Sequence, residues 1–185
     1  LRQEFDLPIV FVSHSVDEIL QIADAMVLLS SGSVVAGGAL ETIMNRPDLS
    51  RLVGNGDSGS VVAVEVTGVD TDYGIAELAF PGGVFRVPAP DLTAGEHLRI
   101  RVRARDVSLA LHPPQEVSVM NVFRGTVADI ENTGGPQVDI AVDVSGATIR
   151  SRITRKSMED LRIAPGAEVY TMVKAVAIDR PARLS

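Results

Sequence analysis

Hydrophobic and polar residues follow two different patterns along this chain. In residues 1–53, short apolar runs alternate with segments of helical spacing. The β-branched and aromatic run Ile9–Val12 predicts a strand buried on both faces of a parallel sheet. Ser15 and Glu18 then have the spacing of a capping box, and the apolar residues after them predict a helix with one buried stripe.

The same segment continues with a hairpin and two short helices. The runs Ala25–Ser30 and Ser33–Ala36 are joined by Ser31-Gly32, which predicts two antiparallel strands with a tight turn. Ala39–Met44 and Pro47–Val53 read as helices, with proline at a favourable first-turn position. Residues 1–53 therefore read as alternating strand and helix.

A composition change separates this part from the rest of the chain. Residues 54–60 consist of glycine, asparagine, aspartate and serine, which pack no core and favour flexible coil. We therefore expect a domain over residues 1–53, a linker over 54–60 and a second domain over 61–185. In that second domain many short β-rich runs are closely spaced, which predicts a small barrel or sandwich. These runs are Val61–Val69, Ile75–Phe80, Val84–Val87, Leu98–Leu111, Phe123–Glu131, Gln137–Val144, Thr148–Ile153 and Val169–Ile178.

The second domain also repeats internally. "LTAGEHLRIRVRARDV" (92–107) aligns without gaps to "IAPGAEVYTMVKAVAI" (163–178), an offset of 71 residues. Upstream, "VEVTGVD" (64–70) resembles "GTVADIE" (125–131). Two tandem copies, over about 61–115 and 116–180, would each be too small to bury a core well, so we expect them to pack on one another.

Composition and charge exclude several classes of protein. The formal net charge of -7 argues against a nucleic-acid coat protein. The absence of cysteine excludes a disulfide framework and a thiolate metal site. No apolar run approaches the roughly 20 residues that a membrane-spanning helix needs.

A histidine follows the first apolar run. His14 stands where the carboxyl end of a parallel strand places ligand-facing side chains. An imidazole there can hydrogen-bond a terminal phosphate and an attacking water without carrying a fixed charge. A Ser-His dipeptide taken alone is also typical of a helix cap or a packed histidine.

The residues around His14 resemble a known family. "PIVFVSHSVDEILQIADAMVLLSSGSVVAGGALETIM" resembles the C-terminal end of the ATPase domain of ABC transporters. In that family a hydrophobic strand ends in the switch histidine, and a helix, a hairpin and a last helix follow. Ala23-Asp24, Gly32 and Gly37 or Gly38 fit the hairpin pattern in order. The resemblance implies that His14 contacts the ATP γ-phosphate in a full-length subunit.

Other parts of an ATPase are absent from the sequence. The 185 residues contain no G-x-x-x-x-G-K-[ST] phosphate loop, no signature motif and no apolar strand ending in Asp-Glu. Phosphoryl transfer depends on such parts acting together. The parent subunit is expected to be an ATPase, whereas this chain, which opens with Leu1, is expected to be a piece of it that does not hydrolyse ATP alone.

A second resemblance lies in the β-rich half. "SVMNVFRGTVADIE" (118–131) resembles the opening of the Mop-type molybdate-binding unit, and residues 153–178 resemble its second block. Met120 stands where the family usually has arginine, and Val176 and Ala177 lack the hydroxyl that often follows the family's lysine. A tetrahedral dianion needs hydroxyl and amide donors and one or two cations. The residues that the resemblance assigns to oxyanion binding are Ser118, Asn121, Thr154, Ser157 and Lys174.

Four arginines of the first copy form a further candidate. Period two puts them on one strand face, either as a secondary anion platform or as a solvated face paired with carboxylates. They are Arg99, Arg101, Arg103 and Arg105.

Together the two blocks resemble the C-terminal portion of the ATP-binding subunit of bacterial molybdate ABC importers. The resemblance implies a mainly β fold: an OB-fold-like small barrel of two tandem Mop/TOBE units, preceded by an α/β remnant of the ATPase domain. It implies ATP and magnesium in the full-length subunit, molybdate or tungstate as a ligand of the barrel, and no metal site. It implies a homodimer at the cytoplasmic face of the inner membrane, working with permease subunits and a periplasmic binding protein and not with nucleic acid. The alternative is a dimerisation module, binding no ligand, of an importer for another anion or a sugar.

Overall fold

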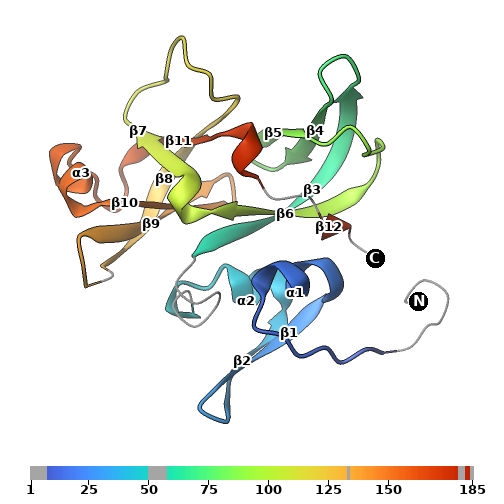
Figure 1. The fold of residues 1–185 in the computed structure, drawn as a ribbon. Coiled ribbons are helices and arrows are strands. Elements are labelled where there is room, and N and C mark those ends of the chain that lie inside the picture. Colours follow the sequence, from blue (N-terminus) through green and yellow to red (C-terminus); the bar gives the residue numbers. More distant parts are fainter. Residues whose placement is uncertain (1–7, 50–57, 133, 179–181, 184–185) are drawn as a thin grey trace.

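Two modules pack together in the computed structural model, which describes residues 8–49, 58–132, 134–178 and 182–183 (Figure 1). The first module is a helix, a hairpin and a short helix beneath the barrel strands. The elements are α1 (Val16–Ile22), β1 (Ala25–Ser30), β2 (Ser33–Ala39), α2 (Leu40–Met44) and a 3₁₀ turn, η1 (Pro47–Leu49). The hairpin, α1 and α2 were predicted from the sequence, whereas the helix predicted at Pro47–Val53 is a 3₁₀ turn over Pro47–Leu49 and its remaining residues lie outside the described ones.

Helix α1 begins with a modified capping box. The Ser15 hydroxyl accepts a hydrogen bond from the Glu18 amide at 3.4 Å, as the spacing predicts. Glu18 does not return to the Ser15 amide, because Ser13 stands between them. The Ser15 amide donates to the Ser13 hydroxyl at 3.0 Å, and that hydroxyl donates to the Glu18 carboxylate at 2.5 Å.

The strand predicted at Ile9–Val12 is not formed. These residues belong to no helix or strand and are solvent-exposed, with Val10 93% and Val12 89% accessible. A strand buried in a parallel sheet needs neighbours that bond its backbone on both sides. Every strand pairing among the described residues is antiparallel and lies elsewhere, so the prediction was wrong for this chain.

The second module consists of two five-stranded antiparallel sheets, as expected for a mainly β fold. One sheet has the order β5-β4-β3-β6-β12 and the other β10-β9-β8-β11-β7. Its strands are β3 (Gly59–Asp70), β4 (Ile75–Phe80), β5 (Gly83–Pro88), β6 (His97–Arg103), β7 (Val107–Ala110), β8 (Asn121–Asn132), β9 (Gln137–Val144), β10 (Ala147–Thr154), β11 (Glu168–Val173) and β12 (Ala182–Arg183). Between them lie α3 (Arg155–Asp160) and the 3₁₀ turns η2 (Ala104–Asp106) and η3 (Ala175–Ala177).

The predicted strand Leu98–Leu111 is broken in the middle. Turn η2 separates β6, in the first sheet, from β7, in the second sheet. The predicted strand Val169–Ile178 likewise ends at Val173, where η3 begins the path from β11 toward β12 and the other sheet. Apolar alternation shows that these residues are extended, but not that the chain changes sheet.

The internal repeat is a structural repeat. Turns η2 and η3 lie at the predicted offset of 71 residues. Gly95 and Gly166 both have positive φ, +89° and +85°, and their amides donate at 2.8 Å to Val66 and Val127. Each unit gives its last strand to the other unit's sheet: β7 pairs with β11, and β12 pairs with β6. The units are therefore interlocked rather than merely adjacent.

The two units share one hydrophobic core. Phe80 and Phe85 of the first unit meet Phe123 of the second, with ring centroids 4.6 to 5.0 Å apart. On β3, Val62, Val64 and Val66 face this core, whereas Val61 faces the first module. Strand β3 is thus covered on both faces where it begins, which fixes the barrel relative to α1 and α2.

Candidate functional site

Lys174 and Ser118 lie at the same end of the second sheet. In the pairing of β8 with β11, Val173 is opposite Asn121, so Lys174 directly follows the last paired residue of β11 and Met120 directly precedes the first paired residue of β8. Ser118 lies two residues further back, in the exposed connection between β7 and β8. Both side chains are exposed, and for the described residues no hydrogen bond or ion pair of the Lys174 ammonium is seen. This ammonium is available to an anion.

Asn121 connects the two units of the barrel. Its side chain is fully buried; its Oδ1 accepts from the Arg86 amide at 2.6 Å and its Nδ2 donates to the Arg86 carbonyl at 3.1 Å. In the first unit, Ser60 takes the corresponding place, and its hydroxyl accepts from the Arg150 amide at 2.7 Å. The Asn121 amide thus joins β8 to β5 and faces away from solvent.

Thr154 and Ser157 form a separate pair. Thr154 is the N-cap of α3, accepts from the Ser157 amide at 3.0 Å and lies 2.8 Å from its hydroxyl. Thr154 pairs with Gln137 at the start of β9, which lies by the last residue of β8, whereas Lys174 follows the β11 residue that pairs with the first residue of β8. Within one chain the five expected oxyanion residues therefore fall into two groups.

A guanidinium lies near the position where the family arginine is replaced by Met120. Met120 lines an open hollow of about 430 Å³ together with Arg86 and Glu77. The Arg86 guanidinium is held by the Glu77 carboxylate at 3.0 Å. Its charge is already balanced, so it is a weak substitute for the missing arginine.

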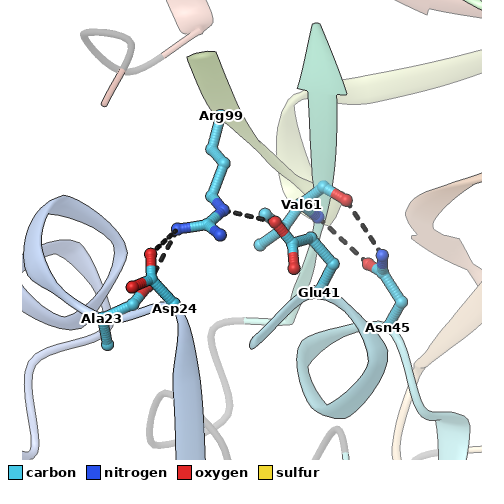
Figure 2. A network of polar contacts seen from close by, with 6 residues as sticks. All are labelled: Ala23, Asp24, Glu41, Asn45, Val61 and Arg99. Atoms are coloured by element: carbon cyan, nitrogen blue, oxygen red, sulfur yellow. Dashed lines mark hydrogen bonds and ion pairs between the residues drawn. The ribbon is translucent and has the colours of Figure 1, made fainter. Parts of the chain in front are cut away.

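The four arginines do not form one open face. Arg99 and Arg101 are 8% and 6% exposed, and Arg105 lies beyond the strand, in η2. Arg99 pairs with carboxylates, but those belong to the first module: its Nε bonds Glu41, and its Nη1 lies 3.9 Å from the Asp24 carboxylate (Figure 2). Arg103 is partly buried and Arg105 is exposed.

Sequence reasoning missed a buried polar cluster formed by β9, β10 and the residue before β3. Asp139 accepts from Arg152 at 2.6 and 2.7 Å and from the Ser58 hydroxyl at 2.7 Å. Burial alone would raise the pKa of Asp139, but hydrogen bonds from Arg152 and Ser58, with the charges of Arg152 and Arg150, hold it below its ordinary value. Arg150 is 2% exposed or less and makes one long bond, 3.4 Å, to the Asn45 carbonyl. Alternation along β10 marks a polar face, and only the packing of the modules shows that this face is covered.

His14 is exposed and directly precedes the N-cap of α1. The described part of the chain gathers no group of three or more histidine or acidic side chains that could hold a metal ion. Within the same ranges, no helix is both long and apolar enough to cross a membrane.

Comparison with known proteins gives matches over both modules. Residues 117–179 match the TOBE domain family. The Mesorhizobium japonicum protein named molybdenum import ATP-binding protein ModC is 39% identical over 180 residues, which are 97% of this chain and 49% of the relative. The Brucella abortus protein of the same name is 39% identical over 98% of this chain and 50% of its own length. The chain spans about half the length of the curated relatives it matches.

A solved structure shares the barrel fold. The cytoplasmic molybdate-binding protein ModG, crystallised with molybdate bound, superposes with a TM-score of 0.57 at 23% identity, over 64% of this chain and 92% of that protein. This likeness establishes the fold of the paired units. Residues 117–179 thus match the TOBE domain family, and the chain is similar in sequence along nearly its whole length to the molybdenum import ATP-binding proteins.

Proposed function

We propose that this chain is the regulatory part of the ATP-hydrolysing subunit of a molybdate or tungstate importer. The observation that carries the proposal is the homology to molybdenum import ATP-binding proteins over 97% of the chain, in both modules. It is supported by an exposed lysine, Lys174, beside the Ser118 motif on a TOBE barrel. In this proposal residues 1–53 end the ATPase domain, 54–60 connect it to the barrel, with Gly59 and Ser60 already in β3, and 61–185 form the two-unit regulatory domain.

The oxyanion would be held by groups from two chains. Lys174 supplies the cation and Ser118 a hydroxyl, and the Thr154–Ser157 pair of a second copy supplies the remaining hydroxyls. A homodimer is thus part of the proposal, because one chain keeps the two groups at opposite ends of a strand. Asn121 acts as a scaffold for the Ser118 segment rather than as a ligand. With Met120 in place of arginine, each site has one lysine charge for a dianion, which favours weak binding.

ATP chemistry belongs to the full-length subunit. His14 would contact the γ-phosphate there, while the groups that hold nucleotide phosphates and magnesium have no counterpart in this sequence. The subunit would work at the cytoplasmic face of the inner membrane with permease subunits and, through them, a periplasmic binding protein. Magnesium and tungstate are part of the same proposal.

Titration calorimetry and sedimentation test the proposal together. The chain should sediment as a dimer and release or absorb heat with molybdate but not with equal sulfate. Lys174→Ala should abolish that heat and keep the dimer. Lys156→Ala is the control, because among the described residues this exposed lysine pairs with Asp160 of its own helix, and the variant should bind as wild type. A dimer without molybdate heat would refute oxyanion binding and favour the dimerisation module of another importer.

A further inference from the structure

Arg99 connects the barrel to the first module through three groups. The residue lies on β6 and is 8% exposed. Its Nε donates to the Glu41 carboxylate on α2, and its Nη1 donates to the Ala23 carbonyl at 2.8 Å and lies 3.9 Å from Asp24. Figure 2 shows the guanidinium placed between the end of α1 and the start of α2. One side chain of the barrel thus fixes two helices of the other module.

The Ala23 carbonyl lies at the carboxyl end of α1. Ala23 is the C-cap, and its amide closes the last turn by donating to Ile19 at 2.9 Å. A cation at this end interacts favourably with the helix dipole. The helix has seven residues, about 10 Å in length, and His14 stands just before its N-cap Ser15. A shift of the carboxyl end is therefore carried to the segment that holds His14.

The other side of Arg99 leads to the second unit. In the first sheet Arg99 is the direct partner of Ala182, on β12. Strand β12 belongs to the segment that follows Lys174 and η3, and η3 packs on β5. The backbone of Arg99 is thus bonded to the chain that leaves the proposed oxyanion lysine, while its side chain holds α1.

Further contacts near Arg99 hold the first module against the barrel. The Asn45 side chain bonds both backbone groups of Val61, donating to the carbonyl at 2.9 Å and accepting from the amide at 3.0 Å (Figure 2). Val61 also belongs to the apolar cluster formed with Leu20, Leu40 and Ile43. Helix α2 is therefore anchored to β3 independently of Arg99, whereas at the carboxyl end of α1 the Arg99 guanidinium donates to the Ala23 carbonyl.

We infer that Arg99 is a positioning residue that couples the segment after Lys174 to α1 and thereby to His14. The inference rests on the proposed function in taking His14 as the histidine that faces the ATP γ-phosphate. In this inference one side chain carries the regulation. An oxyanion that orders η3 and β12 would stabilise the backbone of β6, and Arg99 would in turn stabilise α1, the helix beside His14. The coupling itself exists without ligand and can be tested in this chain.

Hydrogen exchange of backbone amides tests the coupling. In Arg99→Gln, the α1 amides of Ile19 to Ala23 should exchange at least about tenfold faster than in wild type, because a charged hydrogen bond to the helix end is lost. Arg99→Lys should recover part of the protection, since it keeps the charge but lacks the planar fork with which the guanidinium contacts three groups. Amides of β8 and β9 should be unchanged. Arg124→Gln, which removes an exposed pair with Glu168, is the matched control and should change neither region.

Two results would overturn the inference. Unchanged exchange in α1 would mean that Arg99 does not hold the helix. Equally faster exchange in α1, β8 and β9 would mean that Arg99 supports the whole fold and couples nothing in particular. Molybdate calorimetry on the same wild-type sample separates the two proposals, because a missing heat refutes oxyanion binding and leaves the exchange result to decide the coupling.

Discussion

Replacing Arg152 by methionine should destabilise the chain strongly at neutral pH. The Asp139 carboxylate is 3% exposed and would lose two hydrogen bonds, of 2.6 and 2.7 Å, with only the Ser58 hydroxyl left. Removing one partner of a buried ion pair costs about 3–5 kcal/mol, because the other charge stays buried and uncompensated. The remaining Ser58 bond and the nearby Arg150 charge place the expected loss near the lower value, about 3 kcal/mol.

The pH dependence of that loss gives the sharper test. In wild type the folded pKa of Asp139 lies below the unfolded value of 3.8, so its stabilisation is present above that pH and is lost as pH falls through the folded pKa. In Arg152→Met, burial dominates and raises the folded pKa, so lowering the pH protonates the carboxyl and relieves the variant. The difference in unfolding free energy between wild type and variant should therefore shrink from pH 7 toward pH 3.

Urea unfolding followed by circular dichroism at pH 7, 5 and 3 measures both effects. Arg124→Met is the control: its pair with Glu168 is 62% and 65% exposed, and its loss should cost less than about 1 kcal/mol at every pH. A loss below 1 kcal/mol for Arg152→Met at pH 7, or a loss independent of pH, would refute the view that the Asp139 carboxylate is charged and buried in the folded chain.

Two further substitutions test the interlocked units. Gly125→Ala should destabilise by at least about 2 kcal/mol, because an added Cβ would lie 2.5 Å from the Asp143 carbonyl, whereas Gly68→Ala meets nothing within 4 Å and should be nearly neutral in the same urea assay. Asn121→Ala should cost about 2 kcal/mol, since it leaves the half-buried Arg86 amide and carbonyl without their Asn121 partner; a loss under 1 kcal/mol would contradict its scaffold role.

Much of the barrel is predictable because its strands are regular and its turns are marked by glycine. The runs Ile75–Phe80 and Gln137–Val144 form strands with the predicted bounds. The aligned repeats place η2 and η3 at matching positions, although neither turn was predicted as such. Alternation fixes which face of a strand is apolar, but it holds no information on which sheet the strand joins. The exchange of β7 and β12 between the sheets was therefore out of reach.

The buried polar contacts between the barrel and the first module could not be predicted from the sequence for a related reason. Arg99 and Arg150 stand on strand faces that look solvent-facing by pattern, and they are buried because the first module covers them. The strand predicted at Ile9–Val12 failed in the opposite way: its composition suits a parallel sheet that the described residues do not supply. For the candidate site, motif matching found Lys174 and Ser118, but only the register showed that Thr154 and Ser157 lie at the other end.

The central claim is that oxyanion binding on the barrel stabilises α1, the helix beside His14. Amide exchange of the wild-type dimer, measured with saturating molybdate and with equal sulfate, tests it directly. We expect molybdate, but not sulfate, to slow amide exchange around Lys174 and in α1, at Ile19 to Ala23. Protection around Lys174 with no change in α1 would contradict it, because the anion would then bind without reaching His14.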